Sequence, residues 1–251
     1  MEISIAAEKL FSLWGFPVTN AFLIGVLVSA LLIFAITKVT RHPALVPKGL
    51  QNVLEFIFEA LLDLIESVTQ DKKQAKQFFP LIATIFLFVL VANWAGLLPG
   101  LGTVGIWHQN ALGHATIIPF LRSTSADLNF TMALSLITVV TVQCTGIAAL
   151  GIVRYGQKFL ISPFRKPYVI GTVVGILELV SELGKMISFT FRLFGNVFAG
   201  EVLLTVMLHL VPYFLPLPFM FLEIFVGFIQ AVVFAMLTLV FLKMATIPAE
   251  H

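Results

Sequence analysis

The stretch LELVSELGKMISFTFRLFGNVFAGEVLL, Leu177 to Leu204, decides the fold, because it lies inside an apolar segment predicted to form one helix over 169–211. At about 1.5 Å per residue, a helix of this length extends roughly 65 Å, about twice the hydrocarbon thickness of a bilayer. Such a helix cannot stand upright in a membrane. The segment therefore predicts strong tilt, a kink or a double span.

A second apolar segment, 217–247, follows after a short break. As a helix, this segment extends about 45 Å, which is also too long to stand upright. The region of the break contains Pro212, Pro216 and Pro218, and prolines cannot continue a regular helix. We therefore expect a hairpin of two long, strongly tilted membrane helices that turns on the outer side of the membrane.

The composition of the whole chain indicates that a bilayer is its solvent. Of 251 residues, 59% are hydrophobic and 11% are charged, and the mean hydropathy is +1.03. Soluble domains carry roughly 25% charged residues, so the composition argues against a soluble protein. The basic residues form no patch that would bind nucleic acid. The lone Cys144 excludes a disulfide framework, and acidic Glu2 and Glu8 before the first apolar run argue against a signal peptide.

Three ordinary membrane spans are predicted at 18–37, 79–98 and 130–153, each an apolar run of about the length that crosses a bilayer. Segment 51–68 differs, because acidic residues recur at helical spacing on one face and apolar residues lie on the opposite face. It predicts an amphipathic helix that lies in the interface as a connector rather than one that docks a soluble partner. The fold class is all-α integral membrane, with three upright transmembrane helices, one amphipathic interfacial helix and the hairpin in a single domain, 1–251.

The positions of basic residues predict the orientation, because cytoplasmic connections of membrane proteins carry an excess of Lys and Arg. Two connections are basic: Lys38, Arg41, Lys48, Lys72, Lys73 and Lys76 follow the first span, and Arg154, Lys158, Arg165 and Lys166 follow the third. The connection 99–127 has Arg122 as its one firm positive charge, beside His108 and His114, so we expect it on the opposite side. The C-terminus then lies on the cytoplasmic side.

Arg192 is the residue that a membrane setting makes hardest to explain. It lies about twenty residues from either end of its segment, too deep to reach the interface easily, and its guanidinium stays charged. A charged side chain at mid-membrane costs about 2.5–3.5 kcal/mol on insertion scales. The other polar residues of the two long segments include Glu178, Glu182, Lys185, Glu201, His209, Glu223, Gln230 and Lys243. They either pair and hold the helices together or line water-filled routes, and the surplus of carboxylates favours routes.

Helical geometry separates these polar residues into two faces. At 100° per residue, Glu178 falls within about 40° of the Arg192 face, whereas Glu201 points about 180° away. Three further polar residues lie at related positions: Asn196 one turn beyond Arg192, and Glu223 and Gln230 seven residues apart on the next helix. Protonatable groups along a membrane helix suit a proton relay, and an arginine that cannot release its proton would interrupt it.

The stretch from Leu177 to Leu204 closely resembles the signature helix of subunit a of F-type ATP synthases. Three other stretches are similar to the same family in the same order: PxxxPKGLQNVLEFIFE from Pro43 to Glu59, SADLNFTMALS around Asp127 to Ser135, and FIQAVVFAMLTLVFLKMA from Phe228 to Ala245. The resemblance covers most of the chain. It implies a proton-translocating stator subunit of the Fo sector of a rotary ATP synthase.

Members of this family carry protons through two offset half-channels to and from a ring of c subunits, and an arginine of the stator separates the half-channels. The resemblance implies that Arg192 is this arginine, that Glu178 belongs to the cytoplasmic-side half-channel and that Asp127 lines the outer entrance. Four residues are implied at the outer half-channel or its junction with the ring: Glu201, Glu223, Asn196 and Gln230. The implied partners are the c-ring, peripheral-stalk b subunits and membrane lipid.

The chain departs from the family pattern at one point. Some members have a Glu and a His at the positions of Glu201 and Glu223, in either order, whereas this chain has two acids. The departure argues against a simple outer relay that depends on histidine. His209 offers an imidazole two turns beyond Glu201, although a lone His near a helix end is more often incidental.

Two other functions account for part of the sequence. An ion-coupled secondary transporter would show paired repeats, and we find none between the two halves. A passive membrane anchor leaves Arg192, Glu201 and Glu223 unexplained. The sequence contains no nucleotide-binding motif, so we expect a subunit that is not catalytic on its own and carries no cofactor or metal. The expected location is a bacterial plasma membrane, and proton or sodium coupling stays open because the ion site would lie on the ring.

Overall fold

The structure is a computed structural model, and it describes residues 7–13, 15–41, 43–98, 105–109, 115–119, 122–159, 168–211 and 214–247. Its helices are α1 (Asn20–Arg41), α2 (Leu50–Thr69), α3 (Lys72–Ala95), α4 (Leu128–Leu150), α5 (Ile152–Phe159), α6 (Tyr168–Leu210) and α7 (Pro216–Thr246). A 3₁₀ turn, η1 (Thr124–Ala126), precedes α4. Some residues used in the predictions above lie outside the described ranges: Glu2, His114, Arg165, Lys166 and Pro212.

Five helical segments of the described chain are long and apolar enough to cross a membrane: α1, α3, α4, Gly175–Leu210 of α6, and α7. Large apolar side chains such as Phe34, Phe191 and Phe225 are exposed along them. A surface of this kind suits hydrocarbon, because lipid can cover apolar side chains and the backbone polar groups are satisfied within each helix. The prediction of an all-α integral membrane protein is confirmed at this level, and the arrangement of the tilted hairpin stays a prediction.

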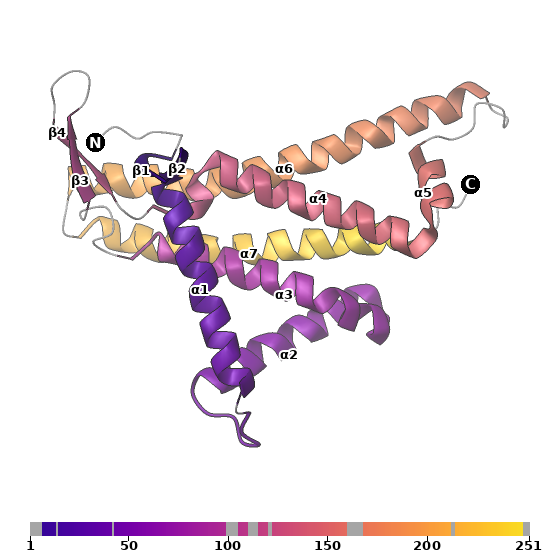
Figure 1. The fold of residues 1–251 in the computed structure, drawn as a ribbon, viewed down its shortest axis with the longest axis horizontal. Coiled ribbons are helices and arrows are strands. Elements are labelled where there is room, and N and C mark those ends of the chain that lie inside the picture. The colour runs from indigo at the N-terminus through magenta and orange to yellow at the C-terminus, as the bar shows by residue number, and fades with distance from the viewer. Residues whose placement is uncertain are drawn as a thin grey trace.

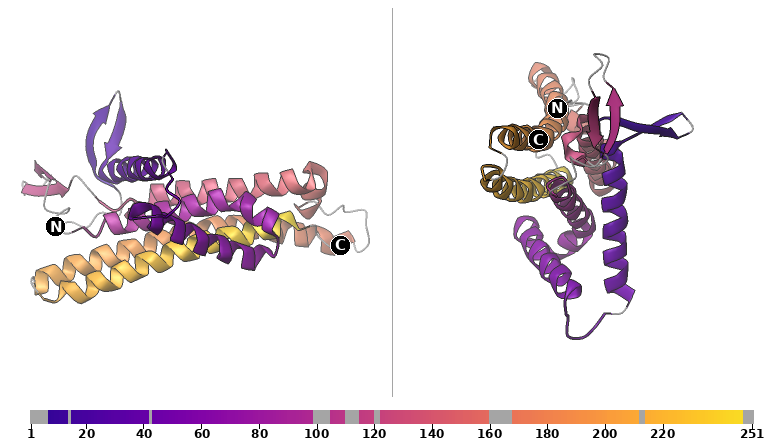
Figure 2. Two further views of the ribbon diagram at one scale, coloured as in Figure 1. Left: turned by 90° about the horizontal axis from the view of Figure 1, so that it is seen from below. Right: turned by 90° about the vertical axis from the view of Figure 1, so that its left-hand side faces the viewer.

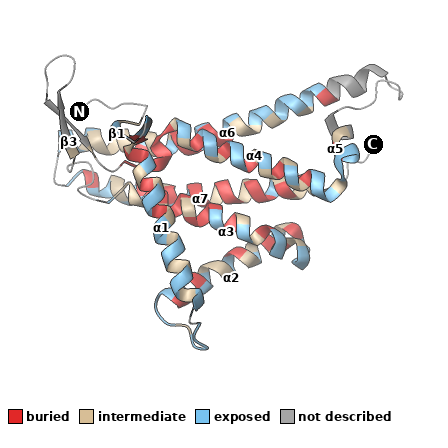
Figure 3. Cartoon of the chain, viewed as in Figure 1, coloured by how far each residue is buried: buried red, intermediate tan, exposed pale blue. Residues whose placement is uncertain are grey.

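The helices α3, α4, α6 and α7 form a bundle that runs along the long axis of the molecule (Figures 1 and 2). Helix α1 packs on the bundle beside η1 and then leaves it at a steep angle towards α2. The buried residues gather where the bundle helices face each other, whereas α1 is mostly exposed (Figure 3). The bundle therefore holds the core, and α6 and α7 form one side of it.

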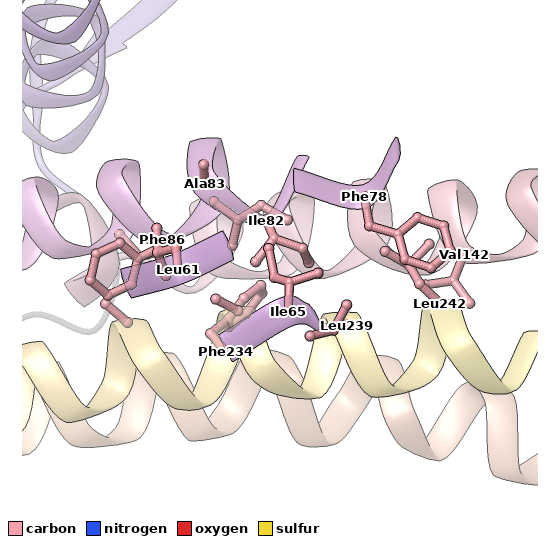
Figure 4. Close-up of a cluster of buried hydrophobic side chains, with 14 of the residues drawn as sticks. Leu61, Ile65, Phe78, Ile82, Ala83, Phe86, Val142, Phe234, Leu239 and Leu242 are labelled. Carbon is pink, nitrogen blue, oxygen red and sulfur yellow. The ribbon is translucent and has the colours of Figure 1, made fainter. Parts of the chain in front are cut away.

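Figure 4 shows the central part of this core, where side chains from α2, α3 and α7 meet. Leu61 and Ile65 of α2 reach Ile82 of α3 and Phe234 and Leu239 of α7. Lipid tails are as apolar as these side chains, so close packing rather than removal from water holds such helices together within a bilayer. The apolar face of α2 is thus packed on protein, while Glu59 and Asp63 are exposed on its other side.

A short corner joins α2 to α3. Gln70 takes a left-handed conformation with φ 53°, and its N–H donates to the Glu66 carbonyl at 2.8 Å. Asp71 then caps α3 by accepting from the Lys73 N–H at 2.8 Å. The cap explains why α3 begins at Lys72, about two turns before the predicted span 79–98.

Two short antiparallel hairpins, which the sequence did not predict, lie beside the helices. β1 (Lys9–Leu13) pairs with β2 (Phe16–Thr19), and β3 (Gly105–Gln109) pairs with β4 (Ala115–Pro119). Gly15 supplies φ 86° in the first turn, a conformation that favours glycine. Strands of four or five residues are too short for alternation of polar and apolar residues to be recognised beside long apolar helices.

The predicted span 130–153 extends three residues too far. Gly151 takes φ 80° and ends α4, and its N–H donates to the Ile147 carbonyl at 2.8 Å. The chain then turns into the separate helix α5. This turn brings α5 against both α4 and α6.

The two long segments form α6 and α7, which pack against each other in the bundle, while the start of α6 diverges from α7 (Figure 1). Helix α6 has 43 residues and α7 has 31. Pro216 is buried at the start of α7, where its missing N–H removes no helical hydrogen bond. The polar residues of both segments are therefore placed by one helix pair.

Candidate functional site

Arg122 and Glu201 form an ion pair at the η1 end of the bundle. The Nε of Arg122 donates to Glu201 Oε1 at 3.0 Å and to Oε2 at 3.1 Å, and Nη2 donates to Oε2 at 3.1 Å. Arg122 is buried, whereas the side chain of Glu201 is 35% exposed. Several N–H groups on one carboxylate make a strong charge-assisted contact. Glu201 thus lies at the edge of a buried segment in which Arg122 supplies a fixed positive charge.

Asn93 joins this segment to α3 and α7. Ser125 donates its hydroxyl to Asn93 Oδ1 at 2.7 Å, and Asn93 Nδ2 donates to the Gly227 carbonyl at 3.2 Å. The side chain of Trp94 donates to the Ile224 carbonyl at 3.0 Å, one turn earlier on α7. The Ser125–Asn93 contact therefore ties η1 to α3, and the other two contacts tie α3 to α7.

Glu223 is buried on α7 and faces Gly200 of α6. A Cβ atom added at Gly200 would overlap the carboxyl group of Glu223, so the carboxyl lies directly on the α6 backbone. The neighbouring Glu201 extends to Arg122 instead. The structure therefore brings Glu201 and Glu223, predicted from distant parts of the sequence, to one end of the α6–α7 pair, where Glu201 pairs with Arg122 and Glu223 lies against Gly200.

Asn196 and Gln230 lie between this end and Arg192. Asn196 Nδ2 donates to Gln230 Oε1 at 2.8 Å across the α6–α7 interface. Among the described residues, four buried side-chain atoms have hydrogen-bonding capacity without a protein partner: Ser123 Oγ, Thr124 Oγ1, Ser135 Oγ and Gln230 Nε2. Buried polar atoms of this kind ordinarily bind water. This end of the bundle is therefore polar well inside the helices.

Arg192 is exposed on α6, and its Nη2 donates to Ser188 Oγ of the same helix at 3.2 Å. Within the described part of the chain, no carboxylate lies within ion-pair distance of this guanidinium. Arg192 lines an open groove of about 360 Å³. The groove is also lined by Ser181, Gly184, Lys185 and Ser188 of α6 and by Leu237 and Phe241 of α7.

Glu178 and Asp127 lie away from Arg192. Glu178 is on α6 and acts electrostatically on the Tyr155 hydroxyl of α5. Burial, followed by the charges of Glu182 and Glu178, raises the pKa of Tyr155 to about 12. Asp127 is buried and caps α4, accepting from the Asn129 N–H at 3.0 Å. Asp127 therefore has a helix-capping contact in addition to the entrance role implied by resemblance.

Several of the other polar residues pair within the chain. This agrees with the alternative in which the polar residues of the long segments pair and hold the helices together. Lys185 Nζ lies 2.6 Å from Glu182 Oε1, and Lys243 Nζ donates to the Thr69 carbonyl at 2.8 Å and to Gln74 Oε1 at 2.9 Å. His209 contacts the Thr205 carbonyl of its own helix and is exposed. Arg192 differs from this group because its hydrogen-bond partner, Ser188, is a neutral hydroxyl.

Sequence reasoning missed the contributions of Arg122, Asn93, Ser125 and Gly200. Arg122 was visible as the one firm positive charge of its connection, and Asn93 as an isolated amide in an apolar run. Neither signal identifies a partner, because Arg122 and Glu201 are 79 positions apart. Gly200 carries no signal of its own in a helix that contains other glycines.

The fold and site together define a class of protein: a helical membrane protein with an arginine that has no carboxylate partner among the described residues and lies between two polar regions of one long helix pair. Residues 20–243 match the family model described as ATP synthase A chain, and the chain belongs to this family. The match extends from α1 through almost all of α7.

Similar proteins cover nearly the full length of the chain. A protein of Campylobacter jejuni subsp. jejuni serotype O:23/36 (strain 81-176), named ATP synthase subunit a, is 34% identical over 224 residues, which are 89% of this chain and 88% of that protein. A protein of the same name from Moorella thermoacetica is 30% identical over 235 residues, 93% of this chain and 94% of that protein.

Proposed function

We propose that this chain is the proton-translocating stator subunit of the Fo sector of a rotary ATP synthase, with two offset half-channels that Arg192 separates. One observation carries the proposal: Arg192 is exposed on a membrane-crossing helix without a carboxylate partner in the described part of the chain. A fixed guanidinium inside a bilayer is costly unless an opposite charge reaches it. An ionised carboxylate on a neighbouring rotating subunit would supply that charge.

The outer half-channel would follow the polar side chains at the η1 end of the bundle. Glu201 is partly exposed at this end, and Glu223 is buried beside Gly200. The pair Asn196–Gln230 continues the polar path towards Arg192, and Gln230 Nε2 retains an unused donor. Two carboxylates can exchange protons without a histidine, which suits the departure of this chain from the family pattern. Asp127 would stand at the entrance.

The cytoplasmic-side half-channel would follow the open groove beside α6. The groove reaches Arg192 past the hydroxyls of Ser181 and Ser188. Glu178 lies further along the same helix, near the corner formed by α4 and α5. Arg192 stands between this groove and the Asn196–Gln230 pair, and a guanidinium is a permanent cation that does not pass protons on. Protons would then cross only on the carboxylates of a turning ring.

The family and this geometry support the partners that we propose. The relatives are named as a subunit of ATP synthase, so this chain would be a non-catalytic part of that complex. A ring of c subunits would pack against the exposed side of α6 around Arg192, and peripheral-stalk b subunits would contact the exposed faces of α1 and α2. The named relatives come from bacteria, which fits a bacterial plasma membrane with the C-terminus on the cytoplasmic side.

The substitution Arg192→Ala tests the proposal. In inverted membrane vesicles, the variant complex is expected to assemble but to lose ATP-driven proton pumping, because nothing attracts the ring carboxylate or separates the half-channels. Pumping is measured by quenching of a pH-sensitive dye, and the amount of complex is measured by immunoblot.

The matched control is Arg154→Ala, which removes an exposed arginine of α5 and should pump normally. Normal pumping by a fully assembled Arg192→Ala complex would contradict the proposed function. A passive membrane anchor predicts that result.

A further inference from the structure

A chain of polar contacts joins three helices on the groove side of Arg192. The Tyr155 hydroxyl of α5 donates to Gln143 Oε1 of α4, and Gln143 Nε2 donates to Glu182 Oε2 of α6 at 2.9 Å. Lys185 Nζ donates to the other oxygen, Glu182 Oε1, at 2.6 Å. Both carboxylate oxygens of Glu182 are therefore occupied, one by an amide and one by an ammonium.

The surroundings fix this chain in place. The side chains of Lys185 and Glu182 are 19% and 12% exposed. The Lys185 ammonium lies 4.9 Å from the centre of the Phe241 ring on α7. Tyr155 is buried against Gly146, where an added Cβ atom would overlap the ring. The Tyr155 hydroxyl is protonated at physiological pH and serves as a donor, and burial raises its pKa further, to about 12.

Lys185 lines the same groove as Arg192. The two residues are seven positions apart on α6, so they lie within about 20° of one face and about 10 Å apart along the axis. Without compensation, Lys185 would be a second cation in the route to Arg192. It would repel incoming protons and would compete with Arg192 for any carboxylate that a partner presents.

We propose that Glu182, held in position by Gln143 and Tyr155, neutralises Lys185 and keeps its ammonium against the groove wall. Glu182 is thus a positioning residue that leaves Arg192 as the attracting cation of the groove. This inference rests on the proposed function, because it assigns a role in the cytoplasmic-side half-channel. It assigns the pair an electrostatic task and no proton transfer of its own.

The size of the effect follows from Coulomb's law. At about 10 Å and an effective dielectric constant of about 20, one unpaired charge changes the local concentration of a monovalent cation by roughly tenfold. Loss of Glu182 should therefore reduce proton entry by about that factor. Loss of the charges of both Glu182 and Lys185 should change proton entry little.

The test uses membrane vesicles that contain the complete complex, from which the catalytic sector is then stripped. Passive proton conduction is measured for the wild type, Glu182→Gln, Lys185→Met and the double variant Glu182→Gln/Lys185→Met. We expect a roughly tenfold loss in Glu182→Gln and near-wild-type conduction in the double variant. High salt should reduce the loss in Glu182→Gln, because mobile ions screen a charge that is open to water.

Either of two results with the Glu182 variants would overturn the inference. Wild-type conduction in Glu182→Gln would show that Lys185 needs no neutralisation, and a double variant as slow as Glu182→Gln would show that Glu182 itself carries protons. Gln143→Leu provides an independent test if Glu182→Gln fails to assemble, because it keeps both charges and removes the amide that holds Glu182. Gln143→Leu should slow conduction less than Glu182→Gln does. Adding Lys185→Met to Gln143→Leu should restore conduction. Unchanged conduction in Gln143→Leu would also contradict the inference.

The Arg192→Ala vesicles serve as a separate arm. If they couple ATP hydrolysis to pumping normally, the proposed function fails. If they behave as expected while the Glu182 series does not, only the neutralisation of Lys185 by Glu182 is wrong.

Discussion

Gly200 shows how one residue without a side chain can position a functional group. The Glu223 carboxyl group of α7 lies where the Cβ atom of any other residue at position 200 would be. The conflict involves a carboxyl group between two closely packed helices, so relief requires Glu223 to rotate or the helices to separate. The position of this acid therefore depends on its neighbour on α6.

The substitution Gly200→Ala is expected to lower proton conduction at least several-fold, because it displaces Glu223 from the proposed outer half-channel. The measurement is passive proton conduction in stripped vesicles, normalised to the amount of assembled subunit. Gly156→Ala is a matched control, since a Cβ atom at that helical glycine meets nothing within 4 Å. Equal conduction by both alanine variants would show that the position of Glu223 does not matter.

At the scale of helices, Lys243 ties the end of α7 to the α2–α3 corner. Its ammonium donates to the Thr69 carbonyl at 2.8 Å and to Gln74 Oε1 at 2.9 Å. Thr69 is itself buried and donates to the Ile65 carbonyl at 2.9 Å. A positive charge at the carbonyl end of α2 also interacts favourably with the helix dipole. These contacts hold the amphipathic helix on the bundle.

The substitution Lys243→Met is expected to destabilise the packing of α2 by about 1.5–3 kcal/mol, the range for hydrogen bonds to a charged group. Thermal unfolding of the detergent-solubilised complex should shift to lower temperature. Lys73→Met, which removes an exposed lysine of α3, should leave the transition unchanged. A Lys243→Met complex as stable as that control would show that the contact contributes nothing.

At the scale of the whole molecule, helix α1 separates two segments that contain exposed residues, one at each of its ends. The hairpin β1–β2 lies at its start, and the connection to α2 follows its end (Figure 1). The excess of Lys and Arg in that connection predicts that it lies on the cytoplasmic side. The hairpin would then lie outside.

Cysteine labelling tests this orientation. In a Cys144→Ser background, Ser12→Cys in β1 should react with a membrane-impermeant maleimide only from the outer side of intact cells. Lys48→Cys, before α2, should react only in inverted vesicles. Both positions are exposed in the structure. The opposite pattern of labelling would reverse the membrane orientation proposed for the chain.

Much of the helical framework could be predicted from the linear sequence, because the length of an apolar run is set by the membrane thickness. The predicted segments 18–37 and 217–247 lie at α1 and α7 within a few residues. The hairpin β1–β2 and the break at Gly151 were not predicted, since both depend on local backbone conformations that hydropathy does not record. For the proposed site, the sequence predicted which residues take part but not which of them lie in contact.

The sequence by itself determined that this chain crosses a membrane and carries a permanent cation, Arg192, inside a long apolar helix. Only the tertiary structure decided which charges are neutralised: Glu201 by Arg122, and Lys185 by Glu182 with Gln143 behind it. The physical reason is that a helix with apolar residues on every side does not show which face meets which neighbour. Ion pairs depend on that rotation and on contacts between distant segments, so they appear only once the helices are packed.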